Sequence, residues 1–292
     1  MKHVPVLLDE TVSVLGLGRD SVVFDCTFGG GGHARRILSH LGSKGVYVGI
    51  DADPVALSGV ELQAEAKVHL VNANFSDIKQ VALDLNLQPT TILADLGWRS
   101  DQFEAGDRGF SFQKDEPLLM TFGDPEKYLF TARDIVNDWK EESLADIIYG
   151  YGEERFSRRI AKAIIWAREK SPIETSKQLA EIVASAYPAI ARRGRIHPAT
   201  KTFQAIRITV NDELGALKKL LSDGFEILEP SGRLAVISFH SLEDRLVKRF
   251  FDEKSRDQLA LKLIKKPIVA GDEEREVNPR SRSAKLRVIE KT

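Results

Sequence analysis

Residues 21–54 read SVVFDCTFGGGGHARRILSHLGSKGVYVGIDADP, and this stretch decides the fold. A β-branched apolar run ends at Asp25, four glycines follow at 29–32, a helix comes next, and a second apolar run ends at Asp51. Glycines let the backbone turn sharply and approach a ligand, a helix start offers unpaired N–H groups, and an acid about 20 residues further on can accept hydrogen bonds from a ribose. Asp51 follows Gly29 by 22 residues. The stretch therefore predicts a βαβ unit that binds a nucleotide-like cofactor.

The glycine pattern also bears on which cofactor is bound. A dinucleotide-binding turn has the form G-x-G-x-x-G with its third glycine inside the helix, whereas here His33-Ala34-Arg35-Arg36 follow an unbroken glycine run. That difference favours a ligand with adenine and ribose but no pyrophosphate, of which S-adenosylmethionine is the common example. A tight turn without any ligand is the alternative. The acid at the second strand end is an independent match that argues against it.

Length and composition describe an ordinary globular chain. At 292 residues it exceeds one typical domain, and its 42% apolar and 29% charged residues are unexceptional. No apolar run of about 18 residues is present, so no membrane span or membrane partner is expected. Asp9 and Glu10 follow a short apolar patch, which is unlike a secretory signal. The single cysteine, Cys26, excludes an internal disulfide, and a cytoplasmic location is expected.

Strand and helix patterns alternate, stop, and then resume. Strands are expected at 67–71, 90–95, 233–238, 261–264 and 285–289, and helices at 76–85, 141–149, 153–169, 175–186, 203–221 and 241–251. Two closing strands fit the seven-strand sheet of class I methyltransferases better than a six-strand dehydrogenase sheet. The predicted fold class is therefore α/β, a doubly wound seven-strand sheet with an inserted helical domain.

The point where the alternation stops sets the expected domain boundaries. Residues 1–100 and 203–292 are expected to form a discontinuous cofactor-binding domain. Residues 101–202 are expected to form an inserted, mostly helical domain that recognises the substrate.

Two segments are rich in cations, although the net charge of the chain is only −1. Neither 189–207 nor 278–287 contains an acid, and together they hold Arg192, Arg193, Arg195, Lys201, Arg207, Arg280, Arg282, Lys285 and Arg287. Clustered cations gain affinity for phosphate backbones through counterion release. The alternative is a solvated basic face that acids nearby in space balance.

Nine stretches together resemble a known family. They are HVPVLLDE (3–10), DCTFGGGGH (25–33), DADP (51–54), NFSD (74–77), RGFSF (108–112), YGEERFSRRIAKAI (151–164), HPATKTFQAIRITVNDEL (197–214), ISFHSLEDRLVKRFF (237–251) and NPRSRSAKLR (278–287). The chain resembles, over nearly its whole length, the bacterial S-adenosylmethionine-dependent methyltransferases that modify cytosine N4 in 16S ribosomal RNA.

The resemblance implies methyl transfer to a cytidine in the decoding region of 16S ribosomal RNA, within the small ribosomal subunit. The oligomeric state stays open. The cofactor contacts that it implies are Gly31, Gly32, His33, Asp51, Phe75, Asp95 and Gln102. RNA contacts are expected at Arg192, Arg193, Arg195, Lys201, Arg280 and Arg282.

Residue chemistry agrees with most of these cofactor contacts. Residues 31–33 can offer N–H groups to the methionine carboxylate, and Asp51 can accept both ribose hydroxyls. Phe75 can form an apolar wall for adenine, or it can be a core residue instead.

Asp95 ends the strand at 90–95 and is the candidate catalytic residue. The lone pair of cytosine N4 is delocalised into the ring, so an acceptor that holds one N–H raises its nucleophilicity and aims it. Asp95 is therefore expected to orient the amine and to accept its proton. The alternative is that Asp95 only contacts the cofactor or caps the next loop.

The chain departs from the family pattern in two places. Trp98-Arg99 stand where a small residue and a serine are usual, and Leu119 and Thr121 replace an expected acid and an expected arginine. Trp98 could stack on a flipped base, yet altered loops could equally lower activity or shift the target. A relative that binds RNA without catalysis, or with altered specificity, therefore stays open. So do a methyltransferase for small molecules or proteins and a nicotinamide-dependent oxidoreductase.

Two histidines, one helix start and one amphipathic segment are further features of the sequence. His197 and His240 are expected to be structural, and no metal site is expected because no pair has metal-ligand spacing. Ser241 looks like a helix N-cap, with Asp244 at the capping-box position. The segment 153–169 is expected to be an amphipathic helix with a basic face that could meet phosphate.

Overall fold

The computed structural model describes residues 5–97, 108–188 and 197–292. The chain forms two compact units. The first, here called the sheet unit, takes in Met1–Arg99 and Leu214–Thr292, and the second, the helical unit, takes in Ser100–Glu213. None of the helices in the described ranges is both long enough and apolar enough to cross a membrane.

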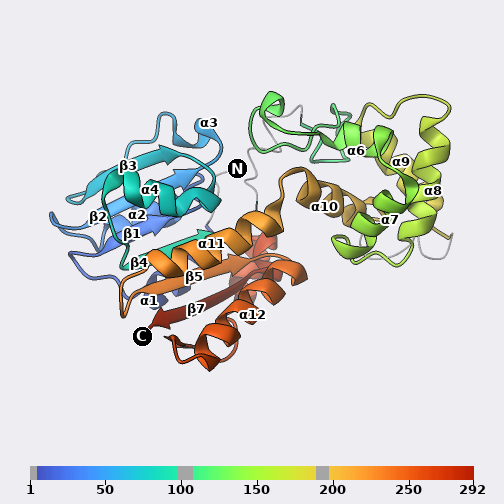
Figure 1. Ribbon diagram of the computed structural model, residues 1–292. Helices are drawn as coiled ribbons and strands as arrows, with labels where there is room; N and C mark the ends of the chain where they lie inside the picture. The colour runs from blue at the N-terminus through green and yellow to red at the C-terminus, as the bar shows by residue number, and fades with distance from the viewer. Residues whose placement is uncertain (1–4, 98–107, 189–196) are drawn as a thin grey trace. The chain divides into compact units, whose positions relative to one another are not determined.

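The sheet unit is built on a seven-strand sheet (Figure 1). Its strands are β1 (Val22–Asp25), β2 (Val46–Asp51), β3 (Lys67–Asn72), β4 (Thr91–Asp95), β5 (Arg233–Ser238), β6 (Ala260–Leu261) and β7 (Lys285–Lys291). The order is β3-β2-β1-β4-β5-β7-β6; the first five strands are parallel, and β7 runs antiparallel to both β5 and β6. The predicted class I methyltransferase sheet is confirmed.

Helices cover both faces of this sheet because alternate strand residues point to opposite sides. Phe24 and Ile92 pack with α4 (Ile78–Leu85), α11 (Glu213–Ile227) and α12 (Ser241–Arg256) on one face. Val23 and Leu93, the adjacent residues in the same strands, pack on the other face with α1 (Leu8–Val14) and α2 (Gly32–Leu38). The shorter segments of this unit are α3 (Pro54–Leu57), η1 (Phe75–Asp77), α13 (Asp272–Val277) and η4 (Pro279–Ser283).

The helical unit has a separate apolar core. Its described elements are η2 (Pro125–Lys127), α6 (Ala132–Asp138), α7 (Glu141–Gly150), α8 (Ser157–Arg168), α9 (Ser176–Ala186) and α10 (Ala199–Val210). Fully buried Ile135, Leu144, Ile160, Val183 and Ile206 each come from a different helix and belong to one cluster.

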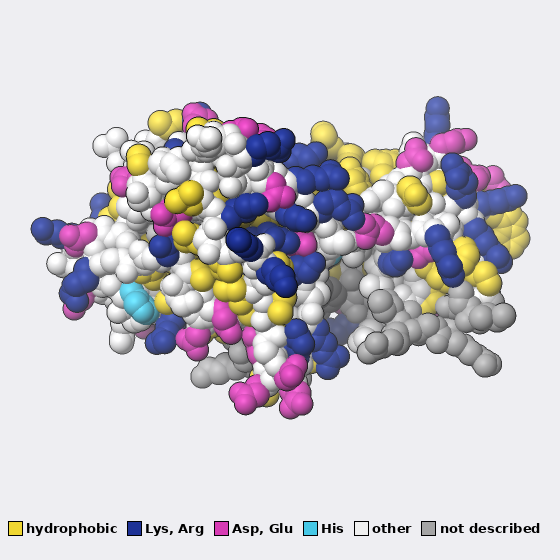
Figure 2. Space-filling model, turned by 90° about the horizontal axis from the view of Figure 1, so that it is seen from below, with side chains coloured by type: hydrophobic (Ala, Val, Ile, Leu, Met, Phe, Trp, Pro, Cys, Tyr) yellow, Lys and Arg dark blue, Asp and Glu magenta, His cyan; other side chains and the backbone are white. Residues whose placement is uncertain are grey.

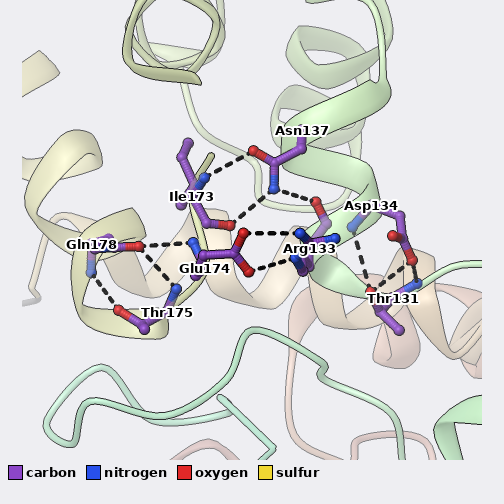
Figure 3. A network of polar contacts seen from close by, with 8 residues as sticks. All are labelled: Thr131, Arg133, Asp134, Asn137, Ile173, Glu174, Thr175 and Gln178. Atoms are coloured by element: carbon purple, nitrogen blue, oxygen red, sulfur yellow. Dashed lines mark hydrogen bonds and ion pairs between the residues drawn. The ribbon is translucent and has the colours of Figure 1, made fainter. Parts of the chain in front are cut away.

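A polar network joins α6 to the start of α9 (Figure 3). Arg133 donates two hydrogen bonds to Glu174, at 2.6 and 2.9 Å. The Asn137 amide donates to the Ile173 carbonyl and accepts from the Ile173 N–H, both at 2.9 Å. Each helix also begins with a capping box, through Thr131 and Thr175. Because the ion pair is about half exposed, the amide bridge and caps carry more of the stabilisation than the charges do.

One helix prediction was wrong at its boundaries. The helix expected at 203–221 is two helices, because Asn211 ends α10 and Asp212 adopts the left-handed conformation at φ 44°. The Asn211 side chain accepts from the Phe122 N–H at 2.9 Å and donates to the Met120 carbonyl at 2.8 Å. Its amide therefore pins the 120–122 segment at the point where the helix would otherwise continue.

Gly49 in β2 lets the glycine loop pack against the sheet. A Cβ added at this position would lie 2.7 Å from Phe28 Cδ2 and 3.0 Å from a Leu70 methyl carbon. Phe28 is only 3% exposed, and its N–H donates to the Ile50 carbonyl at 2.9 Å. Phe28 thus anchors the start of the loop directly over a residue that has no side chain.

We predict that Gly49→Ala destabilises the sheet unit by about 1–3 kcal/mol, because the added methyl forces Phe28 to move in a packed core. Urea unfolding at equilibrium measures the change. Gly30→Ala is the control, since an added Cβ there has no neighbour within 4 Å. Equal stability of the two variants would contradict the packing argument.

Candidate active site

Acidic side chains gather at one edge of the sheet. Asp25, Asp51 and Asp95 are the last residues of β1, β2 and β4, and Glu243 lies in the first turn of α12, which follows β5. The carboxyl ends of parallel strands meet at one edge, where ligands of open α/β sheets bind. The edge therefore brings together residues that are far apart in the sequence.

Asp51 holds the glycine loop through backbone hydrogen bonds. Its Oδ2 accepts from the Gly29 N–H at 2.8 Å, and its Oδ1 accepts from the Asp53 N–H at 2.9 Å. Gly29 and Gly31 have positive φ angles of 56° and 70°, a conformation that glycine adopts without strain. An ionised carboxylate offers about four acceptor sites, so these two hydrogen bonds are compatible with further ones to a ribose.

Asp25 is a buried carboxyl group with two donors. The Tyr47 hydroxyl donates to its Oδ2 at 2.6 Å, and the Thr27 N–H donates to its Oδ1 at 3.2 Å. Burial raises the pKa of Asp25 to about 6, against these two hydrogen bonds and with a smaller contribution from the charge of Asp51. Asp25 therefore changes its protonation state in the mildly acidic range.

Asp95 is the least compensated carboxyl group at this edge. Its Oδ1 is buried and has no hydrogen-bond partner among the described residues, and its Oδ2 lies 3.7 Å from His33 Nδ1. Burial raises the pKa of Asp95 well above its ordinary value; the charges of Asp25 and Glu243 raise it further, while Arg280 lowers it. Buried acceptors in folded proteins nearly always have a hydrogen-bond donor, and a bound ligand can supply the donor for this oxygen.

His33 is fixed by the N-terminal segment. Its Nε2 lies 3.2 Å from the Val6 carbonyl, which can only accept, so Nε2 carries a hydrogen. Nδ1 is thereby turned toward Asp95. The side chain is buried beside Gly32, where an added Cβ would come within 2.2 Å of Pro5 Cγ. Gly32 and His33 thus occupy the start of α2 directly beside the candidate catalytic residue.

The cap of α12 was predicted at the wrong residue. His240, not Ser241, is the N-cap, and Glu243, not Asp244, completes the capping box. Glu243 Oε2 accepts from the Phe239 and His240 N–H groups at 2.8 and 3.2 Å. Asp244 instead accepts from Lys285 Nζ at 2.9 Å and from Arg287 Nε at 2.7 Å.

Of the remaining expected site residues, four lie in the described ranges. Phe75 is half-buried in η1 and packs against the core of the sheet unit. Lys201 donates to the Glu153 carbonyl at 2.8 Å and lies 3.8 Å from Glu154. Arg280 lies close enough to Asp95 to lower its pKa, and Arg282 is exposed. Outside the described residues lie Gln102, Arg192, Arg193, Arg195 and the departure at Trp98-Arg99.

Sequence reasoning missed Asp25, Tyr47 and Glu243 as members of this edge. Asp25 had the same signal as Asp51 and Asp95, an acid that ends an apolar strand. Tyr47 and Glu243 carried no such signal, because their roles depend on pairing between β1 and β2 and on the cap of α12.

The MraW methylase family model matches residues 1–292, the whole chain. The chain belongs to the MraW methylase family. It is 44% identical over 308 residues to the protein named ribosomal RNA small subunit methyltransferase H of Brevibacillus brevis, covering 99% of this chain and 98% of the relative. The protein with the same name from Deinococcus radiodurans is 48% identical over 290 residues, covering 99% and 89%.

A solved structure, described as an rRNA methylase from Streptococcus thermophilus, covers 100% of this chain and 98% of its own, with 12% identity and a TM-score of 0.38. Membership of the MraW methylase family confirms the resemblance found in the sequence. It also confirms the expected enzyme class, a methyltransferase, and S-adenosylmethionine as its cofactor.

We predict that Asp25 makes the protein less stable as pH rises. The folded state holds this proton up to pH about 6 and the unfolded chain only to 3.8. Stability from this group is complete below pH 3.8 and is lost through pH 6, by about 3 kcal/mol at about 1.36 kcal/mol per pKa unit. Asp25→Asn should remove this part of the decline, measured by urea unfolding between about pH 4 and 7.5.

Asp20→Asn, an exposed acid in the same unit, is the matched control and should keep the wild-type dependence. If Asp25→Asn followed wild type over the whole pH range, the buried carboxyl group would not have the raised pKa.

Proposed function

We propose that this methyltransferase transfers a methyl group to the exocyclic N4 of a cytidine in 16S ribosomal RNA, in the decoding region of the small ribosomal subunit. A cytoplasmic location accompanies that substrate. The observation that carries the chemistry is Asp95, a buried carboxyl group at the end of β4 whose Oδ1 has no hydrogen-bond partner among the described residues. The names of the relatives, which refer to small-subunit ribosomal RNA, support the substrate.

The cofactor site that we propose is the edge around the glycine loop. S-adenosylmethionine supplies a transferable methyl group on a sulfonium. In this proposal Gly31, Gly32 and His33 bind its methionine part, Asp51 binds the ribose, and Phe75 lines the adenine. Gln102 belongs to the same set. The buried acceptor of Asp95 and the Asp51 carboxylate at the loop support the fit.

Asp95 has two tasks in the proposed reaction. Its carboxylate holds an N–H of the target amine, which turns the N4 lone pair toward the methyl group, and it accepts the proton that the amine loses. Its raised pKa suits the second task, because an acceptor is more effective when its pKa lies nearer the working pH. The positive charge of Arg280 opposes this rise in pKa and so favours the ionised form.

We assign substrate recognition to the helical unit and to basic residues on the sheet unit. Lys and Arg side chains gather in the middle of the view in Figure 2, where Figure 1 places α12. The exposed cations of that helix are Arg245, Lys248, Arg249 and Arg256. They join Arg282 in the proposed RNA contacts, to which Arg192, Arg193, Arg195, Lys201 and Arg280 also belong.

A relative that binds RNA without methylating it is the second candidate function. The departure at Leu119 and Thr121 favours it, because an acid and an arginine are replaced there. Thr121 is fully buried, and its hydroxyl donates to the Gly123 carbonyl at 3.1 Å, so an uncharged residue is well accommodated at this place. Methyl transfer from labelled S-adenosylmethionine to purified small subunits distinguishes the two functions.

We predict that Asp95→Asn lowers kcat for methyl transfer by about 10²- to 10⁴-fold, because the amide cannot accept the proton of the amine. Heat of binding for S-adenosylhomocysteine, measured by calorimetry, should persist. The wild-type kcat should rise with pH through the raised pKa of Asp95, since only the ionised form accepts a proton, and this rise should be absent from the variant.

Asp20→Asn is again the control, with kcat expected at the wild-type level. Unchanged turnover by Asp95→Asn would remove Asp95 from the mechanism. Absence of methyl transfer by the wild type to both small subunits and naked 16S ribosomal RNA would remove the proposed function.

A further inference from the structure

One face of α8 is cationic along its whole length and carries an exposed tryptophan. Positions three or four residues apart on a helix lie on one face, and this face, with the residues that flank the helix, holds Arg155, Arg158, Arg159, Lys162, Trp166 and Lys170, all exposed. We call these six residues the α8 face. Glu169 is the one acid within this stretch. Figure 2 shows Lys and Arg side chains over the region that α8 occupies in Figure 1.

Packing inside the helical unit fixes which way this face points. Ile160, Ala161 and Ile164 are buried in the core on the other side of the helix. Arg168, a cation that is not on the α8 face, donates to the Val136 and Trp139 carbonyls at 3.0 and 2.7 Å. The orientation of α8 is therefore set by its own unit, and its cations are held outward.

The cations of the α8 face are not in ion pairs with other described residues. Aromatic rings are the described contacts of two of the five. Arg155 lies 4.6 Å above the Phe156 ring and Lys170 lies 3.2 Å above the Trp166 ring, both measured to the ring centroid. A surface of this kind differs from the basic segment at 278–287, where Asp244 engages Lys285 and Arg287.

Trp166 is a second and independent feature. It is 62% exposed although Lys170 lies over its ring, so most of this large apolar side chain faces water. Exposing a large apolar side chain to water is unfavourable. The packing of α8 does not explain the tryptophan, because Ile160 and Ile164 are the residues that fill the core. An indole beside cations is the combination that binds single-stranded nucleic acid: bases stack on the ring and phosphates contact the charges.

We infer that the α8 face is a docking surface for a single-stranded segment of the substrate RNA, with phosphates on its cations and a base on Trp166. This inference rests on the proposed function and adds to it the surface that receives the RNA outside the catalytic edge. An acidic protein surface would use the charges, but it would give no role to an open indole. The helix is about 18 Å long for its 12 residues, and Arg155 and Lys170 extend the strip at its two ends.

The first experiment tests the charges. Arg159→Gln with Lys162→Gln is compared with Lys127→Gln with Lys177→Gln, two exposed cations in the same unit that are outside the α8 face. Affinity for in vitro transcribed 16S ribosomal RNA is measured by filter binding at several salt concentrations. Loss of two phosphate contacts should reduce the slope of log affinity against log salt by about 1.4, at about 0.7 per contact for a single strand. The control pair should keep the wild-type slope.

The second experiment tests the indole. Trp166→Ala should weaken RNA binding by about tenfold, and Trp166→Phe, which keeps an aromatic face, should restore most of the affinity. RNA should quench the tryptophan fluorescence of the wild type, and Trp166→Phe should reduce that quenching. For the charge and indole variants alike, the KM for RNA should rise while kcat at saturating RNA and the heat of S-adenosylhomocysteine binding stay unchanged.

The outcomes separate this inference from the proposed function. The inference is overturned if the charge variant and Trp166→Ala both keep the wild-type affinity and slope. It is also overturned if the variants bind assembled small subunits more weakly but naked RNA normally, because that result would indicate a protein contact. If the wild type fails to methylate RNA, the proposed function fails, and the binding comparison still decides the role of the α8 face.

Discussion

Burial of carboxyl groups at one edge of a parallel sheet is the constraint on which the site depends. Asp25 and Asp95 have raised pKa values mainly because burial disfavours their charged forms, and neighbouring acids add to the effect. The Tyr47 hydroxyl and the Thr27 N–H compensate Asp25, and the charge of Arg280 lowers the pKa of Asp95. The fold thus tolerates several acids in a small volume because they need not all be ionised together, and a group that gains or loses a proton readily is what proton transfer requires.

The glycine loop at this edge is attached to the sheet on two sides. Asp51 holds Gly29 from one side, and Phe28 anchors the loop over Gly49 from the other. Any change in the pairing of β1 with β2 would move both attachments, since Asp25 is opposite Gly49 in the register. The loop is therefore positioned by strand register, and its conformation is a consequence of the core and not of the glycines alone.

The sequence predicted what depends on local pattern. Apolar runs that end in acids located β1, β2 and β4 with their carboxylates, the two closing strands indicated the strand count, and the glycine pattern and then the family resemblance indicated the cofactor. It could not predict the break after Val210, because Asn211 stops the helix by bonding to the 120–122 segment, a contact between positions about 90 residues apart. Nor could it choose His240 over Ser241 as the cap of α12, since both residues can accept from a backbone N–H and the backbone conformation that makes one of them the cap is not visible in the sequence.

Basic residues show most clearly that residues clustered in the sequence need not form a free cluster in the folded chain. The segment 278–287 contains no acid, yet Asp244 from α12 pairs with two of its cations, and Arg280 lies beside Asp95. The cations of α8 are interleaved in the sequence with apolar residues, and the helix sorts them onto one side because its other side is needed for the core. Cations that are clustered in the sequence at 278–287 are thus partly engaged by a carboxylate within the fold, whereas the cations at helical spacing on α8 have no ion pair with a described residue. Affinity for a phosphate backbone gains most from the second kind of distribution, since cations that already pair with a carboxylate release fewer counterions when RNA binds.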